Sequence, residues 1–195
     1  MARPGRILIS EPELKARIAE LGADLARDYG RGTSSPIVVG VLQGAFLFMA
    51  DLVRATQIDL TTDFIGVVSY AGAQSSGHVR IVSDLSMSIE GRDVIVVEDI
   101  VDTGLTLTYL KRTLEARHPR SLRVCVLVDK VERRKVDVGL DYVGFTIPNV
   151  FVVGYGFDHA GYYRNLRHIA ALEPSAGLGE GPAARVPPRA RMKPA

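Results

Sequence analysis

The sequence has little of several features that mark particular classes of protein. It contains one cysteine, Cys125, and no tryptophan among 195 residues. A single cysteine cannot form an intrachain disulfide, and its place in the apolar run 124–127 predicts a small buried side chain rather than a nucleophile. Nothing in the sequence therefore requires an oxidising compartment.

Long hydrophobic runs are also absent. The longest nearly apolar span, residues 37–50, is interrupted by Gln43 and is shorter than the ~20 residues that a membrane-spanning helix needs. The apolar stretch before the polar Ser10 is only three residues long, at 7–9, which is too short for a secretory signal. We therefore expect a cytoplasmic protein without a membrane partner.

An excess of positive charge is missing from most of the chain. The net charge is +2, but residues 174–195 carry four basic residues against one acid, so the remainder is slightly acidic. A nucleic-acid-binding surface would need a basic face. The charge distribution therefore predicts no nucleic-acid partner.

The bulk composition fits one α/β domain followed by a tail. Hydrophobic residues make up 47% and charged residues 24% of the chain, as in ordinary soluble proteins. Residues 173–195 hold five of the ten prolines and few large apolar side chains, which predicts a disordered tail. We assign the folded domain to residues 1–172.

Residues 94–106, VIVVEDIVDTGLT, are the most informative stretch. Four β-branched residues at 94–97 predict a buried strand of a parallel sheet, ending at Glu98 and Asp99. The segment 102–106 is a polar turn that leads into a helix with leucines at 107, 110 and 114. The free N–H groups at the start of such a helix attract anions, so this turn predicts a phosphate site.

The acids before this turn would repel a bare phosphate. They suit a ligand that carries hydroxyls or a metal ion beside its phosphate, because Mg²⁺ prefers one or two carboxylates together with ligand oxygens. The alternative is that Glu98, Asp99 and Asp102 are merely solvated at a strand end. Three acids interleaved with Thr-Gly-x-Thr favour the first interpretation, a sugar phosphate bound with Mg²⁺.

This stretch resembles the phosphoribosyl-pyrophosphate (PRPP) binding motif of the purine phosphoribosyltransferases, and its residues are most similar to those of the hypoxanthine-guanine branch. The resemblance extends over about residues 8–172. It implies a type I phosphoribosyltransferase fold, with a central, mainly parallel sheet flanked by helices, a small hood and a mobile lid loop. It also implies that the ribose phosphate is bound by Glu98, Asp99, Asp102, Thr103, Gly104, Leu105 and Thr106.

A second strand, turn and helix unit precedes this motif. Residues 37–42 form a buried strand pattern, Gln43-Gly44-Ala45 a tight turn, and residues 46–53 a helix. A plain helix entry and a second anion site are equally good interpretations. The resemblance implies pyrophosphate binding at Gln43 and Gly44, although relatives often have a lysine where this chain has Gln43.

A small polar loop at 71–77 lies between two predicted strands, 62–70 and 79–83. A flexible linker is the simple interpretation, but long loops inside a domain often close over a site. The resemblance supports such a lid, with Ser69 and Tyr70 at its base.

Further matches lie toward the C-terminus. Lys130 follows a predicted strand at 122–128, on the edge where open α/β sheets bind ligands. The resemblance implies that Lys130, Phe151, Val152 and Asp158 bind the purine, and that Arg164 binds pyrophosphate. The charged run at 132–135 is interpreted as a solvated turn.

Together these matches imply an enzyme that transfers the phosphoribosyl group from PRPP to N9 of a 6-oxopurine, hypoxanthine and also guanine, giving IMP or GMP and pyrophosphate. Asp102 would be the catalytic acid/base at purine N7, and Mg²⁺ would be held by Glu98, Asp99 and Asp158. Relatives form dimers or tetramers, so we expect a homodimer or homotetramer. The alternatives are a transferase for xanthine or adenine, and a PRPP-fold RNA-binding regulator.

Overall fold

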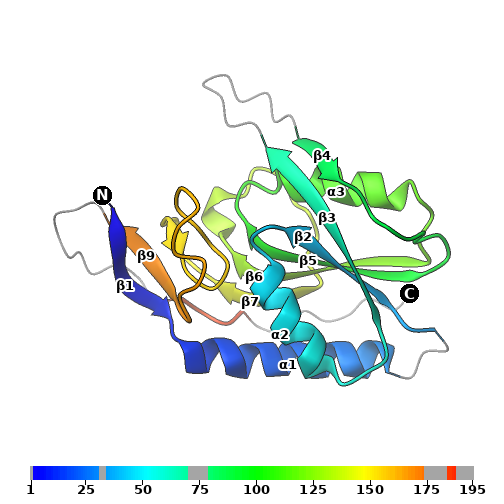
Figure 1. Cartoon of the computed structure of the whole chain (residues 1–195), viewed down its shortest axis with the longest axis horizontal. Helices are drawn as coiled ribbons and strands as arrows, with labels where there is room; N and C mark the ends of the chain where they lie inside the picture. The colour runs from blue at the N-terminus through cyan, green and yellow to red at the C-terminus, as the bar shows by residue number, and fades with distance from the viewer. Residues whose placement is uncertain (1, 31–33, 70–78, 174–183, 188–195) are drawn as a thin grey trace.

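The structure, a computed structural model, describes residues 2–30, 34–69, 79–173 and 184–187 (Figure 1). Its helices are α1 (Glu11–Tyr29), α2 (Phe46–Thr56), α3 (Leu105–Glu115) and the short 3₁₀ helix η1 (Val131–Arg133). Its strands are β1 (Arg3–Ile9), β2 (Ile37–Leu42), β3 (Thr61–Ser69), β4 (Val79–Ser83), β5 (Asp93–Val101), β6 (Ser121–Asp129), β7 (Tyr142–Thr146), β8 (Val152–Val153) and β9 (Ile169–Glu173).

The main sheet has the strand order β4-β3-β2-β5-β6-β7. Strands β3, β2, β5, β6 and β7 run parallel, and only β4 pairs antiparallel, with β3. The predicted α/β class and the mainly parallel sheet are confirmed. Strand β5 lies in the middle, so the loop that follows it opens at the centre of the sheet's carboxyl edge.

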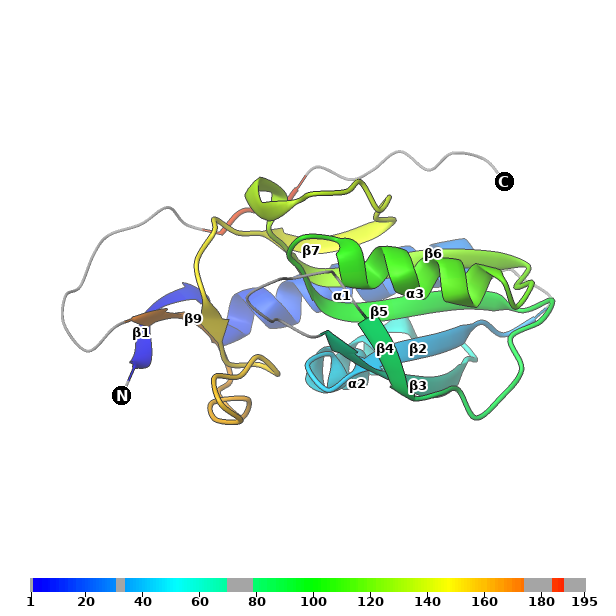
Figure 2. The ribbon, with the colours of Figure 1, turned by 90° about the horizontal axis from the view of Figure 1, so that it is seen from above.

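Helices cover both faces of this sheet (Figure 2). Apolar residues of α1 and α2 pack on one face with Ile95 and Val97 of β5, while leucines of α3 pack on the other face with Val94 and Val96. Successive side chains of a strand point to opposite faces, which explains this alternation. The β-branched run 94–97 is therefore buried on both sides, as predicted.

The start of α1 is fixed by a capping box. The Glu13 N–H donates to Ser10 Oγ at 3.5 Å, and the Ser10 N–H donates to Glu13 Oε2 at 2.8 Å, which completes a capping box. This fixes the point at which the chain leaves β1 and enters the helix.

Strand β5 is longer than the sequence predicted, and this corrects the expected end of the strand at Glu98. Pairing with β6 continues past the acids, with Glu98 opposite Val126, Ile100 opposite Val128 and Val101 opposite Asp129. The polar residues resemble a strand end, but the neighbouring strand supplies backbone partners beyond them. Glu98 and Asp99 consequently sit on a regular strand rather than on a loop.

The hood predicted from the resemblance is a small separate sheet with the order β1-β9-β8 (Figure 1). Its first strand, β1, was not predicted, and its strand β8 contains only Val152 and Val153. The chain between β8 and β9 turns sharply, with positive φ angles at Gly154 and Gly156. These turns bring the segment 154–166 over the carboxyl edge of the main sheet.

Part of the predicted tail belongs to ordered structure. Glu173 is the last residue of β9, and Arg185 exchanges two backbone hydrogen bonds with Thr146 of β7, of 2.6 and 2.8 Å. Ala184 also packs against the core. These residues are not disordered, while the division of the chain at residue 172 stays a prediction.

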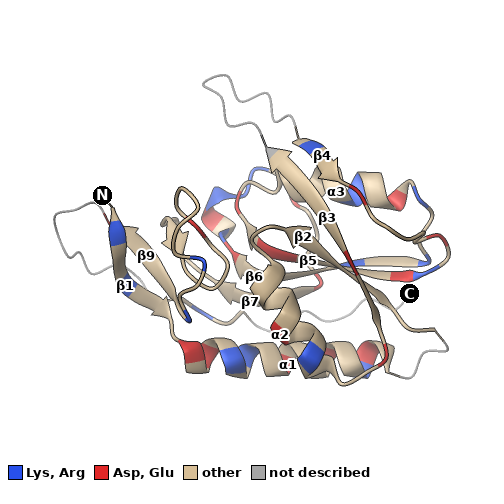
Figure 3. Ribbon diagram, viewed as in Figure 1, with Lys and Arg blue, Asp and Glu red and all other residues tan. Residues whose placement is uncertain are grey.

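Acidic and basic residues are interspersed along α1 and the sheet strands rather than gathered by sign (Figure 3). Among the helices that the structure describes, none is long and apolar enough to cross a membrane.

Candidate active site

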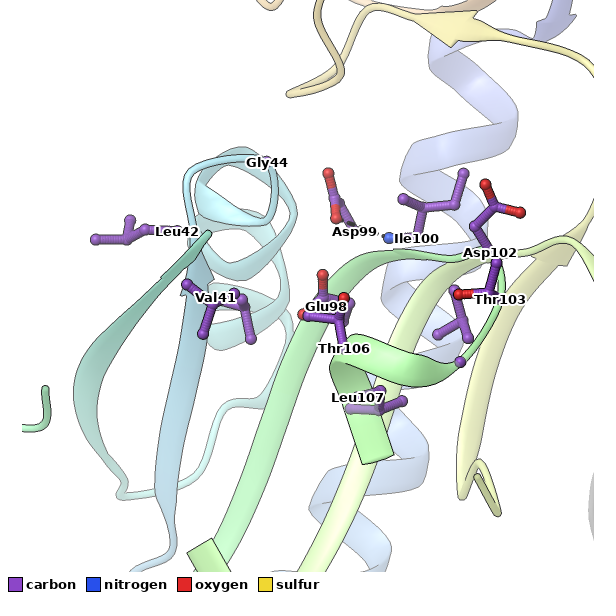
Figure 4. A pocket seen from close by; sticks show the side chains of 13 residues that line it. Val41, Leu42, Gly44, Glu98, Asp99, Ile100, Asp102, Thr103, Thr106 and Leu107 are labelled. Atoms are coloured by element: carbon purple, nitrogen blue, oxygen red, sulfur yellow. Dashed lines mark hydrogen bonds between the residues drawn. The ribbon is translucent and has the colours of Figure 1, made fainter. Parts of the chain in front are cut away.

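A cavity of about 260 Å³ lies where β5 leads into α3 (Figure 4). Its lining includes seven of the residues predicted from the sequence: Gly44, Glu98, Asp99, Asp102, Thr103, Gly104 and Thr106. The carboxyl end of β2 and the turn before α2 form its other side. The two strand–turn–helix units found in the sequence therefore meet at one site.

Gly104 shapes the wall of this cavity. It adopts φ +84°, and a Cβ at this position would lie 2.9 Å from the backbone oxygen of Val136. Only glycine takes up this conformation without strain. Gly104 thus lets the chain turn tightly into α3, whose N-terminus faces the cavity and favours an anion there.

Glu98 and Asp99 diverge because they are neighbours on a strand. Glu98 and Thr106 both line the first cavity, whereas Asp99 points toward Gly44 (Figure 4). A Cβ on Gly44 would lie only 1.7 Å from Asp99 Oδ2, so this carboxylate occupies the space that a side chain would need. The peptide bond between Leu42 and Gln43, just before Gly44, is cis.

The carboxyl groups of Glu98 and Asp99 both have a raised pKa in the free protein. Burial raises the pKa of Glu98 well above its usual range, and the charge of Asp99 raises it further. Burial also raises the pKa of Asp99, although the Ile100 N–H donates to Asp99 Oδ1 at 2.8 Å and offsets part of the effect. In addition, Glu98 Oε2 is buried and lacks a hydrogen-bond partner among the described residues.

We expect Glu98→Gln to stabilise the free protein at neutral and alkaline pH. The pKa of Glu98 is higher in the folded protein than its ordinary value of 4.5, so folding stability falls as the pH rises from 4.5 through the folded-state pKa. The neutral variant avoids this loss, and we expect a gain of about 1–3 kcal/mol, because each unit by which folding raises the pKa costs about 1.4 kcal/mol once the pH exceeds it. Melting temperatures of both proteins at pH 5 and pH 8 test this. A melting-temperature difference that shrinks with rising pH would contradict it.

A second cavity, of about 320 Å³, adjoins the first and extends under the hood. Its lining combines Lys130 at the end of β6 with Phe151, Val152, Phe157, Asp158 and Arg164. Four residues, Gly44, Asp99, Ile100 and Asp102, line both cavities. The site is therefore one space with two lobes joined beside Asp99 and Asp102.

Lys130 and Asp102 both line the second lobe, and their charges interact. Lys130 is only 7% exposed, and burial lowers the pKa of its ammonium, which the charge of Asp102 partly restores and that of Arg133 lowers further. Asp102 itself accepts a hydrogen bond from Arg133 Nε at 2.9 Å. The second lobe is thus lined by a hydrogen-bond donor, the ammonium of Lys130, and by an acceptor, the carboxylate of Asp102.

Phe151 does not belong to the core. Its side chain is 54% exposed and lies edge-on to His159, with ring centroids 5.6 Å apart. Phe151 is therefore not a core residue, and its ring is open to a flat ligand. Val152, by contrast, is buried within β8.

Arg164 joins the hood to the turn before α2. Its Nη2 lies 2.6 Å from Asp158 Oδ1, and its Nη1 donates to Gly156 O at 2.5 Å. Gly156 packs directly on the turn, since a Cβ there would lie 2.2 Å from Gly44 O. The guanidinium is therefore held over the junction of the lobes, where its planar fork suits a phosphate or pyrophosphate.

Some predicted site residues lie apart from these cavities. Gln43 is exposed and Leu105 begins α3, and neither belongs to the lining of the two lobes. Ser69 ends β3, whereas Tyr70 and the predicted lid lie outside the described residues.

Sequence reasoning also missed some lining residues. Ile100 lines both lobes and Phe157 lines the second, yet both side chains are apolar and gave no separate chemical signal. Arg133, the partner of Asp102, was interpreted as part of a solvated charged turn. Lys130 was the signal that could have identified Arg133, because Arg133 belongs to the helix η1 that directly follows this predicted site residue.

Comparison with known proteins gives a consistent result. Residues 7–160 match the model of the phosphoribosyl transferase domain family. The chain is 46% identical over 171 residues to the hypoxanthine-guanine phosphoribosyltransferase of Bacillus subtilis, covering 87% of this chain and 94% of that protein. It is 46% identical over 167 residues to the hypoxanthine phosphoribosyltransferase of Escherichia coli K12, covering 85% and 94%. A crystal structure of a hypoxanthine phosphoribosyltransferase from Staphylococcus aureus matches with a TM-score of 0.83 at 42% identity, over 88% of this chain and 92% of that one.

Proposed function

The chain belongs to the phosphoribosyltransferase family, and on that premise we propose how its residues carry out the family's reaction. It is an enzyme of purine salvage that transfers the 5-phosphoribosyl group of PRPP to a 6-oxopurine and releases pyrophosphate. In this reaction the bond between C1 of the ribose and purine N9 forms, and the bond between C1 and pyrophosphate breaks.

The observation that carries the assignment of residues is the junction of the two lobes. The ribose 5-phosphate fits the first lobe, at Thr103, Gly104, Thr106 and the start of α3. The purine fits the second, between Lys130 and Phe151. The reacting carbon then lies at the junction, beside Asp99 and Asp102, which belong to both lobes.

The polar groups of the two lobes have distinct tasks. Asp102 takes the proton from purine N7, which makes N9 a better nucleophile. Arg164 binds the leaving pyrophosphate as a planar donor. Glu98 and Asp99 bind the ribose hydroxyls, and their negative field favours the positive charge that grows on the ribose in an oxocarbenium-like transition state.

The same carboxylates fit Mg²⁺. No group of three or more potential ligand side chains is gathered among the described residues. Mg²⁺ commonly uses one or two carboxylates and completes its shell with substrate oxygens, and the unpartnered Glu98 Oε2 is an acceptor of the required kind. Glu98 and Asp99 would hold the ion, with Asp158 on the pyrophosphate side, and the ion would neutralise charge on PRPP.

A steady-state assay with PRPP, Mg²⁺ and each of hypoxanthine, guanine, xanthine and adenine tests the function. We expect turnover with hypoxanthine and guanine, and product nucleotide equal to the pyrophosphate released. Turnover with adenine alone would contradict the assignment of Lys130 as a donor to the 6-oxo group.

Replacing Lys130 by Met should weaken purine binding selectively. A hydrogen bond from a buried ammonium to the 6-oxo group contributes about 1.5–3 kcal/mol, so KM for hypoxanthine should rise at least about tenfold. The KM for PRPP should stay within about twofold, because Lys130 lines only the second lobe. An equal rise in both KM values would show that the residue supports the fold of the site rather than the purine.

Homodimer or homotetramer assembly and a cytoplasmic location stay predictions from the sequence. The alternative of an RNA-binding regulator is not favoured, because relatives at 46% identity are hypoxanthine and hypoxanthine-guanine phosphoribosyltransferases and because acidic and basic residues are interspersed along the described elements (Figure 3).

A further inference from the structure

Arg133 contacts the proposed catalytic base directly, although its sequence context suggested only a solvated turn. Its Nε lies 2.9 Å from Asp102 Oδ1. The residues are 31 positions apart, so the contact depends on the tertiary structure rather than on local sequence. It links the segment that carries Lys130 to the loop that follows β5.

Backbone contacts fix the relative position of these two segments. The N–H groups of Lys135 and Val136 donate to Thr103 O at 3.0 and 3.4 Å. Gly104 packs so closely on Val136 that a Cβ would lie 2.9 Å from its carbonyl oxygen. Backbone contacts therefore hold the chain around Arg133 against the loop that contains Asp102, independently of the contact between the two side chains.

The helix η1 also contacts the chain that leads to Phe151. The Arg133 N–H donates to Lys130 O at 3.0 Å, and Asn149 N–H donates to Glu132 Oε2 at 3.4 Å. Through η1, Lys130 and the chain that leads to Phe151 are thus connected to the loop of Asp102. Arg133 is the side chain that completes this connection at the reacting group.

The contact with Arg133 leaves one carboxylate oxygen of Asp102 free to bind the purine. A carboxylate has two oxygens, and Arg133 occupies Oδ1, so Oδ2 can accept from purine N7. The next residue, Arg134, is paired differently, with Asp129. Arg133 is therefore the arginine of this run that bears on Asp102.

Stabilisation of the fold is a weaker explanation of the pair. The side chains of Arg133 and Asp102 are 46% and 42% exposed, and exposed ion pairs contribute little to folding stability. A hydrogen bond to Nε can nevertheless select one orientation of a carboxylate, because the guanidinium is planar and rigid.

We propose that Arg133 is a positioning residue for catalysis, which holds the Asp102 carboxylate with one oxygen directed to purine N7. The proposal rests on the proposed role of Asp102. It predicts an effect on turnover that exists only while residue 102 is an aspartate.

A double-mutant cycle tests this prediction, with kcat measured at saturating PRPP and hypoxanthine for the wild type, Arg133→Ala, Asp102→Asn and the double variant. We expect Arg133→Ala to lower kcat about fivefold, the upper range for an exposed ion pair, and to change KM for PRPP less than about twofold. In the Asp102→Asn background the same change should lower kcat less than about twofold. Arg133→Lys, which keeps the charge but not the planar fork, should fall between Arg133→Ala and the wild type.

Arg117→Ala is the matched control, because Arg117 forms a similar ion pair with Asp84, of 2.9 Å, outside the lining of both lobes. It should leave kcat unchanged. Wild-type turnover of Arg133→Ala, or an equal fold loss in both backgrounds, would overturn the proposal for Arg133. Wild-type turnover of Asp102→Asn would instead remove the role of Asp102 itself. Should Arg133→Ala fail to fold, Arg133→Gln repeats the cycle with a side chain of similar length.

Discussion

Asp102→Asn should lower kcat about 10²–10⁴-fold, the contribution that a positioned general acid or base makes to a proton transfer. Asparagine keeps the size of the side chain and one oxygen for Arg133, but it cannot take the proton from purine N7. The loss should appear mainly in kcat, because the walls of both lobes are otherwise unchanged. Steady-state and single-turnover kinetics with hypoxanthine and PRPP measure it.

Asp137→Asn provides the control for this variant. Asp137 lies on the nearby chain after η1, accepts a hydrogen bond from the Gly139 N–H and lines neither lobe. It should keep its turnover. Near-normal turnover of Asp102→Asn would show that the proton leaves by another route and that the residue serves binding at most.

Gly44→Ala should lower kcat/KM by about 10²-fold or more. The added Cβ would lie 1.7 Å from Asp99 Oδ2, so the carboxylate would have to leave the junction of the lobes. The turn has little room to withdraw, because Gly156 packs on Gly44 O from the hood side. A displacement of about 1 Å at a reacting centre can cost a factor of this size.

Gly91→Ala separates this effect from a general loss of stability. Gly91 has φ +66°, so alanine is strained there, yet its Cβ would meet nothing within 4 Å. We expect this variant to lose stability, by about 1 kcal/mol, and to keep kcat/KM. If Gly44→Ala and Gly91→Ala changed melting temperature and activity in the same proportion, the proposed clash with Asp99 would be irrelevant.

The central motif could be interpreted from sequence because its information is local. The β-branched run 94–97, the turn at Gly104 and the leucines of α3 lie within 21 residues, and each has the pattern of the element that it forms. The length of β5 could not be deduced in the same way. Whether a strand continues through two acids depends on the pairing with β6, which no local pattern contains.

The hood and Arg133 show the same limit. Strand β1 contains Pro4 and Gly5 and pairs with β9, more than 150 residues away, so its pattern is weak and its partner distant. Arg133 stands in a charged run that would look identical if it were only solvated. Its contact with Asp102 arises from the parallel placement of β5 and β6, which brings the ends of both strands to one edge.

The pairing of Arg185 with β7 has a consequence for the whole molecule. Strand β7 is an outer strand of the main sheet, and an outer strand offers unpaired N–H and C=O groups on which another chain can add a strand. At Thr146 both of these groups are taken up within the same chain. Arg185 therefore covers the edge of β7 at Thr146 and withholds these two groups from pairing with another chain.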